Sequence, residues 1–157
     1  MGSDSDLPIV EKGINVLREY GVPHEVHVYS AHRTPKETAD FVSTAKDNGF
    51  GVIIAAAGMA AHLAGAVAAN TTLPVIGIPI SSKSTGGMDA LLATVQMPSG
   101  IPVATVAIDG AANAALLAVE ILALSEPELD KALVAARKAG EEKVLEKNRA
   151  IEEKFNI

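Results

Sequence analysis

The chain has 157 residues, a formal net charge of −6 and no cysteine. This length fits one domain that is large enough to bury a full core. The absence of cysteine excludes disulfides, thiolate catalysis and cysteine-ligated metals. The acidic balance argues against nucleic acid and anionic membranes as partners. No signal peptide or apolar run long enough to span a bilayer is visible, so we expect a cytoplasmic protein.

The first stretch is a small, polar loop over residues 1–6, followed by helical periodicity over residues 7–20. A helix N-terminus that follows such a loop is a natural seat for a phosphate group. Ser3 and Ser5 offer hydroxyls, and Asp6 stands where a helix N-cap belongs. We therefore expect these three residues to contact a ligand, with simple helix capping as the alternative for Asp6.

Residues 24–29 alternate like a half-exposed edge strand, in which His24 and His27 are expected to face solvent. A helix is predicted from Pro35 to Asn48, closed by a glycine. The segment between these two elements lies at the carboxyl end of the predicted strand, where open α/β sheets place their ligands.

That crossing contains Ser30, His32 and Arg33. Arg33 is a permanent cation suited to phosphate, and His32 is the one side-chain type that titrates near neutral pH without help. The pair predicts a phosphate anchor beside a proton donor. A surface salt bridge for Arg33 and a merely exposed His32 are the alternatives.

Residues 51–57 form an unbroken apolar run, which predicts a central strand buried on both faces. The run ends in Ala57 and Gly58, whose small size lets backbone amides approach a planar ligand. An alanine-rich helix follows and ends near Asn70. His62 stands at its start, either as a ligand contact or as a packing residue.

The remaining chain continues to alternate strands and helices. The pattern predicts strands over 74–80 and 101–108, helices over 88–95 and 111–123, and a polar loop over 81–87 that serves as a lid or subunit contact. This alternation predicts an α/β fold with three αβα layers and a flavodoxin-like parallel sheet. That order requires one more strand before Gly2, so we expect the written chain to lack its true beginning.

The last part of the chain reads as a helix of about 28 residues from Glu128, which would be roughly 40 Å long. We therefore divide the chain into a flavodoxin-like catalytic domain over 1–125 and a helical arm over 126–157 that packs on a neighbouring subunit. A tail folded back on its own domain is the alternative. The interior glycine, Gly140, weakens the helix or marks a close approach to a neighbouring element.

Several motifs together resemble one family. The stretches Gly2-Ser-Asp-Ser-Asp6, Ser30-Ala-His-Arg33 and Ala57-Gly-Met-Ala-Ala-His-Leu-Ala-Gly65, with Pro74-Val-Ile-Gly-Ile-Pro79 and the run from Gln96 to Ile108, resemble the class I 5-(carboxyamino)imidazole ribonucleotide mutases of purine biosynthesis, the phosphoribosylaminoimidazole carboxylase catalytic subunit family. The family usually has proline where this chain has Ala64, which should loosen a turn slightly. The related class II carboxylases typically carry Lys in place of Arg33 and lack the pair that begins with His62, so class I is favoured.

The resemblance implies a cofactor-independent isomerisation in IMP biosynthesis, in which the carboxylate on the exocyclic nitrogen of the substrate moves to ring carbon 4. His32 would act as general acid and then general base. The resemblance further implies that Arg33 binds the phosphate with Ser5 and Ser30, that Ser3 and Asp6 bind the ribonucleotide, and that Ala57, Gly58 and His62 lie near the reacting group. It also implies a homo-octamer, with no metal, nucleic acid or membrane involved.

Two other functions remain open at this stage. One is the class II reaction, which carboxylates aminoimidazole ribonucleotide with free carbon dioxide. The other is a flavodoxin-like module that binds a phosphorylated ligand without transforming it.

Overall fold

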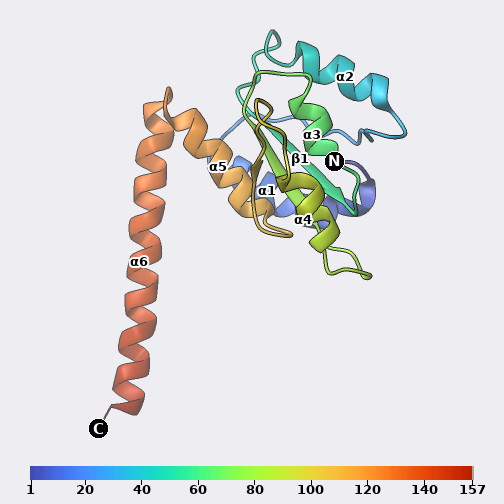
Figure 1. Cartoon of the computed structure of the whole chain (residues 1–157). Helices are drawn as coiled ribbons and strands as arrows, with labels where there is room; N and C mark the ends of the chain where they lie inside the picture. Colours follow the sequence, from blue (N-terminus) through green and yellow to red (C-terminus); the bar gives the residue numbers. More distant parts are fainter. Residues whose placement is uncertain (157) are drawn as a thin grey trace.

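A parallel sheet of three strands lies between two layers of helices (Figure 1). The computed structural model describes residues 1–156. Strands β1 (Ile53–Gly58), β2 (Val75–Ile80) and β3 (Ala104–Thr105) are neighbours in that order, and both pairs are parallel. The predicted α/β class with a flavodoxin-like parallel sheet is confirmed.

The helices cover both faces of this sheet. Helices α1 (Leu7–Glu19) and α5 (Ala111–Ala123) pack on one face, and helices α2 (Pro35–Thr44), α3 (Leu63–Ala68) and α4 (Met88–Val95) pack on the other. The predicted helices over 7–20, 88–95 and 111–123 therefore agree with the structure to within one residue. The helix predicted over 35–48 is shorter, because the chain leaves the helix after Thr44 through a series of turns.

Strand β1 supplies both hydrophobic cores, because successive side chains of a strand point to opposite faces. Ala55 and Ala57 belong to the core under α2 and α3, whereas Ala56 belongs to the core under α1 and α5. On the face covered by α1 and α5, these two helices cross very closely, since a Cβ atom added at Gly13 would lie 2.7 Å from the carbonyl oxygen of Ala111. Small residues thus bring the helix layers tightly onto the sheet.

The strand predicted over residues 24–29 is absent, since these residues belong to no helix or strand. Among residues 1–156, Met1 alone exchanges main-chain hydrogen bonds with this segment, donating to the carbonyl of His27 and accepting from the amide of Tyr29, and a single residue does not make a strand partner. His24 and His27 are both partly exposed, in agreement with the expectation that they face solvent. The centroid of the His27 ring lies 5.0 Å from that of Tyr29, with the two rings stacked. It lies 4.7 Å from that of Phe41 in α2, with those two rings tilted.

The strand predicted over 101–108 is reduced to the two residues of β3. The amide of Val106 donates to Gly77, but the next bond to β2 comes from the amide of Asp109 to Pro79 instead of from residue 108. One extra residue between these bonds breaks the regular ladder, as in a bulge. The apolar pattern predicted burial correctly and missed this interruption.

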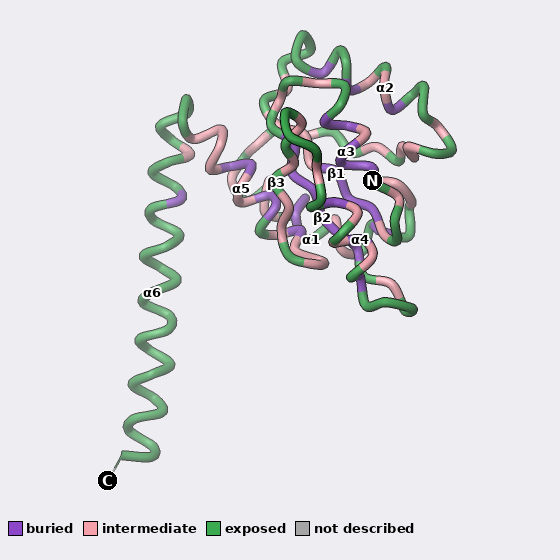
Figure 2. Tube along the Cα trace, viewed as in Figure 1, coloured by how far each residue is buried: buried purple, intermediate pink, exposed green. Residues whose placement is uncertain are grey.

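Helix α6 (Pro127–Phe155) has 29 residues and extends away from the domain (Figures 1 and 2). Only Leu133 is buried along it, and Arg137 forms an ion pair of 2.6 Å with Glu120 of α5. Gly140 lies inside the helix, and a Cβ atom there would meet nothing within 4 Å. Within residues 1–156 the arm therefore does not fold back on its own domain. Its last residue as predicted, Ile157, lies outside the described residues.

Candidate functional site

The loop that begins at Gly2 starts beside the carboxyl end of β1. The amide of Gly2 donates to the carbonyl of Ala56 at 3.0 Å, and a Cβ atom at Gly2 would lie 3.8 Å from the Cβ of Ala57. A short 3₁₀ turn, η1 (Asp4–Asp6), follows and leads directly into α1. The predicted ligand loop and the Ala57-Gly58 turn are therefore neighbours in space.

Arg33 joins a second loop to this one. Its Nη2 donates to the carbonyl oxygen of Gly2 at 2.9 Å, across a sequence separation of 31 residues. Its Nε and its backbone amide both lie near the Ser30 hydroxyl, at 3.5 and 3.2 Å. Among residues 1–156 no carboxylate lies within ion-pair distance of Arg33, so the surface salt bridge considered as an alternative is not formed. An exposed guanidinium without a counter-ion is well suited to an anionic ligand.

The carboxylate of Asp6 does not cap α1, although Asp6 occupies the N-cap position. Ser3 instead accepts the amide of Ser5 at 3.3 Å and so caps η1. The Asp6 side chain accepts a long bond of 3.4 Å from the Ser5 hydroxyl, and the residue is 7% exposed. Burial raises the pKa of the Asp6 carboxyl, while hydrogen bonds from the Ser3 backbone and the Ser5 hydroxyl oppose that shift. Simple capping therefore does not explain this buried carboxylate.

His32 lies on the exposed turn between Ser30 and α2. Its side chain makes no hydrogen bond to another of the described residues. It is thus adjacent to the Arg33 anchor and free of a structural partner, which leaves both of its nitrogens available.

His62 is held by the protein itself. Its Nδ1 lies 2.5 Å from the carbonyl oxygen of Ala93 in α4, and its ring covers Gly65 in the first turn of α3. His62 and Met59 both have positive φ angles, of 52° and 53°, in the loop that follows β1. Non-glycine residues in this region are strained, and such strain clusters at functional sites. The ring has a clear packing role, and the loop that carries it belongs to the same edge of the sheet.

The sequence model of one family, described as AIR carboxylase, matches residues 1–143. The chain belongs to the AIR carboxylase family.

Two relatives extend this likeness across nearly the whole chain. The N5-carboxyaminoimidazole ribonucleotide mutase of Pyrococcus horikoshii is 54% identical over 153 residues, covering 98% of this chain and 86% of the relative. The protein of the same name from Methanocaldococcus jannaschii is 51% identical over 155 residues, covering 99% and 96%. Among solved structures, PurE of Treponema denticola superimposes with a TM-score of 0.85 at 28% identity, covering 100% of this chain and 96% of that one.

The predicted site residues lie along an open edge of the sheet, outside any enclosed cavity. A cavity of about 900 Å³ does exist, but it lies along the side of β1 and none of the predicted site residues lines it. The two loops joined by Arg33 are the candidate site, because they bring hydrogen-bond donors and an unpaired cation together. Within the described residues, no group of three His, Asp or Glu side chains is arranged to hold a metal ion. No helix in that part of the chain combines the length and the apolar character needed to cross a membrane.

One polar residue at the same edge of the sheet, Asp109, was not predicted from the sequence. Asp109 has a φ of 58°, and its carboxylate accepts the amide of Ser81 at 2.8 Å. The contact ties the polar loop after β2 to the end of the β3 segment. The signal was an Asp-Gly pair directly after an apolar run, which marks a turn with a left-handed residue.

Proposed function

We propose that this chain is an isomerase of purine biosynthesis, which moves the carboxylate of 5-(carboxyamino)imidazole ribonucleotide from the exocyclic nitrogen to ring carbon 4. Family membership and the mutase relatives support the reaction. The observation that carries the proposal is the bond from Arg33 to the Gly2 carbonyl, which holds two polar loops together beside the end of β1.

We assign the phosphate of the nucleotide to Arg33, with the Ser5 and Ser30 hydroxyls. The unpaired guanidinium and its proximity to Ser30 support this role, because charge-assisted bonds to phosphate are strong. Ser3 and Asp6 take the ribose hydroxyls. The buried, uncapped Asp6 carboxylate supports this role, since ribose hydroxyls would supply the donors that it lacks.

The reaction needs a proton donor and acceptor, and the proposal gives both roles to His32. As the C–N bond of the carboxyamino group breaks, carbon dioxide forms and His32 protonates the departing nitrogen. Ring carbon 4 then attacks the trapped carbon dioxide, a C–C bond forms, and neutral His32 accepts the proton that carbon 4 releases. The imidazole returns to its starting state, so no external reagent is consumed.

Carbon dioxide must be kept from escaping between these steps. The small residues Ala57 and Gly58 line that position in the proposal, and His62 lies near the carboxylate. The strained loop from Met59 to His62 supports this placement.

Separate supply of the two possible substrates tests the reaction. We expect turnover of 5-(carboxyamino)imidazole ribonucleotide without bicarbonate. Turnover of only aminoimidazole ribonucleotide plus bicarbonate would instead establish the carboxylation, which the description of the family model favours as the second candidate.

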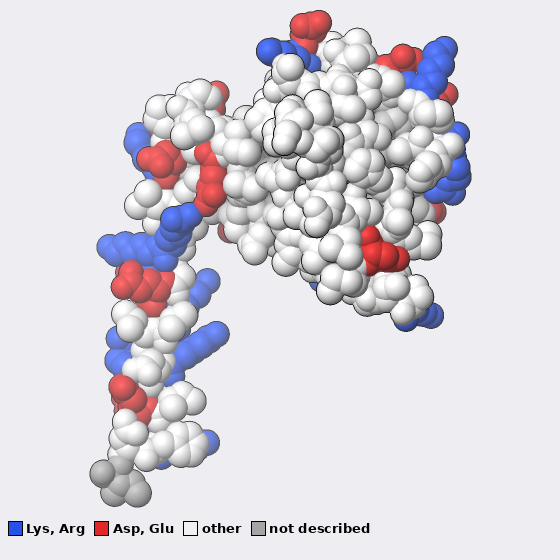
Figure 3. Space-filling view, viewed as in Figure 1, with Lys and Arg blue, Asp and Glu red and all other residues white. Residues whose placement is uncertain are grey.

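The proposal extends to the assembly and its location. We propose that residues 1–125 form the catalytic domain, that the arm over 126–157 packs on a neighbouring subunit, and that the enzyme is a cytoplasmic homo-octamer. Val144, Ile151 and Phe155 support the packing role, since they share one side of α6 and are 59–65% exposed. Lys, Arg, Asp and Glu side chains are spread along the same helix, as expected of a surface that is only partly covered (Figure 3).

Size measurements test the role of the arm. We expect Val144→Glu combined with Ile151→Glu to lower the mass found by light scattering. An unchanged mass would remove the arm from the interface.

A further inference from the structure

Thr34 occupies the N-cap position of α2, but its hydroxyl does not cap that helix. The hydroxyl instead points back along the chain to Ser30. It accepts the amide of Ser30 at 2.8 Å and donates to the carbonyl oxygen of Ser30 at 3.2 Å. The amide of Thr34 donates to the same carbonyl at 2.9 Å. These bonds close the turn that carries His32 and Arg33.

The first turn of α2 holds Thr34 in place. The hydroxyl and the amide of Thr38 both donate to the Thr34 carbonyl, at 2.8 and 3.1 Å. Thr38 is 5% exposed, so this contact is anchored on the packed side of α2. Pro35 follows Thr34 and disfavours the helical conformation there, in agreement with backbone angles of φ −133° and ψ 55°. Thr34 therefore links the packed helix to the exposed turn.

The side chain of Ser30 continues these contacts toward the candidate site. Its hydroxyl accepts the amide of Arg33 at 3.2 Å, and Nε of Arg33 lies 3.5 Å from it. Thr38, Thr34, Ser30 and Arg33 thus form one chain of hydrogen bonds, which leads from the buried side of α2 to the exposed guanidinium.

The position of His32 depends on this turn more than that of Arg33 does. Arg33 has a second anchor, because its Nη2 donates to the Gly2 carbonyl at 2.9 Å. The His32 side chain makes no hydrogen bond to another of the described residues, so the backbone of the turn alone sets where its imidazole lies. A group that transfers a proton must lie within hydrogen-bond reach of the reacting atom. A displacement of about 1 Å can lower the rate about 10²-fold.

We propose that Thr34 is a positioning residue for the isomerisation, because its hydroxyl fixes the turn that presents the His32 imidazole to the bound nucleotide. The inference rests on the proposed function, which assigns proton transfer to His32 and the phosphate to Arg33. The competing role for Thr34 is packing of its methyl group, since the residue is half-buried. Valine keeps the shape and loses the hydroxyl, whereas serine keeps the hydroxyl and loses the methyl group, so the two variants separate these roles.

Steady-state turnover and calorimetry on the full chain test the inference. We expect Thr34→Val to lower kcat for 5-(carboxyamino)imidazole ribonucleotide by at least about tenfold. The dissociation constant of the product nucleotide should change by less than about threefold, because Arg33 keeps its bond to Gly2. Thr34→Ser should restore kcat to within about threefold of the unmodified chain. An unchanged binding stoichiometry in each variant shows that the loss of turnover does not come from unfolded protein.

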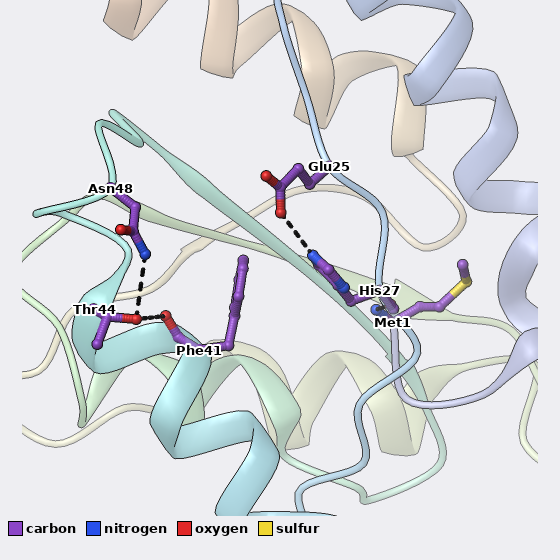
Figure 4. A network of polar contacts seen from close by, with 6 residues as sticks. All are labelled: Met1, Glu25, His27, Phe41, Thr44 and Asn48. Carbon is purple, nitrogen blue, oxygen red and sulfur yellow. Dashed lines mark hydrogen bonds and ion pairs between the residues drawn. The ribbon is translucent and has the colours of Figure 1, made fainter.

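Thr44→Val is the matched control within the same helix. The Thr44 hydroxyl also bonds to main-chain carbonyls, those of Asp40 and Phe41 at 3.0 and 3.2 Å, and it accepts from Asn48 at 3.5 Å (Figure 4). It lies in the last turn of α2, at the opposite end from Thr34. Thr44→Val should therefore leave kcat unchanged.

Hydrogen exchange of the Ser30 amide reads the turn without any turnover. We expect this amide to exchange at least about tenfold faster in Thr34→Val than in Thr34→Ser, because only the serine variant keeps the acceptor. Equal exchange in the two variants would overturn the inference.

The kinetic results can overturn the inference separately from the proposed function. Unchanged kcat in Thr34→Val would do so, and so would an equal loss in Thr34→Ser or in Thr44→Val. A loss of nucleotide affinity as large as the loss of kcat would also do so, because the hydroxyl would then serve binding. All of these outcomes leave the proposed function standing. An unmodified chain that does not turn over the nucleotide would overturn both.

Discussion

Gly65 offers a sharp test of where the His62 ring lies. A Cβ atom at Gly65 would overlap the ring, and even the Cδ2 atom of His62 would be only 2.9 Å away, compared with at least 3.4 Å in ordinary contact. Gly65→Ala must therefore push the ring off α3 and break its bond to Ala93. Overpacking of this kind costs about 1–3 kcal/mol, and the lost bond adds roughly 0.5–1.5 kcal/mol. The gain in helix propensity of at most about 1 kcal/mol offsets part of this loss.

Gly140→Ala is the matched control, because its Cβ meets nothing within 4 Å. It should stabilise the chain by up to about 1 kcal/mol. Urea unfolding at one protein concentration measures both variants, and we expect Gly65→Ala to be the less stable by about 2 kcal/mol or more. Equal stability of the two variants would refute the described position of the His62 ring.

Three further predictions follow from the charged groups. Arg33→Ala should weaken nucleotide binding by about 1.5–3 kcal/mol in calorimetry, while Arg149→Ala on the exposed arm should leave it unchanged; equal effects would remove Arg33 from the phosphate role. Asp6→Asn should weaken ribose binding yet stabilise the free chain at neutral pH. Since the folded pKa of Asp6 is raised, the unmodified chain should gain stability from this group as pH falls through that pKa, with no further gain below the ordinary carboxyl value; a variant that keeps this pH dependence would contradict the assignment. Arg137→Ala should change the free energy of unfolding by less than about 1 kcal/mol, because the ion pair of Arg137 with Glu120 is exposed. A larger loss would mean that this ion pair holds α6 against α5.

The helices and strands that were predicted best from the sequence are those for which an apolar composition alone was sufficient. β1, β2 and α5 are runs of small and apolar residues. Such runs are buried wherever they lie in the fold, so their position as buried elements did not depend on which segments are their neighbours. The strand prediction for residues 24–29 failed because a strand needs a neighbouring strand to bond with. Among the described residues, this segment bonds through its main chain to Met1 alone. The β3 strand was shortened by an irregular step before Asp109, which no apolar pattern records.

For the candidate site too, the local features were predicted from the sequence and the long-range contacts were not. The segment from Ser30 to Arg33 was expected at the carboxyl end of a strand and the loop over residues 1–6 at the start of a helix, and the structure brings the two together beside the end of β1. The bond between Arg33 and Gly2 was not predictable, because a contact across 31 residues depends on how the strands are ordered. The bond between His62 and Ala93 likewise depends on the placement of α4 against α3.

The central claim is that His32 moves the proton while Arg33 holds the phosphate. Replacing His32 with Asn keeps a polar side chain of similar size and removes the titrating group. We expect turnover of 5-(carboxyamino)imidazole ribonucleotide by His32→Asn to fall by about 10²–10⁴-fold, while the dissociation constant of the nucleotide changes by less than about threefold. Unchanged turnover in this variant would contradict the account.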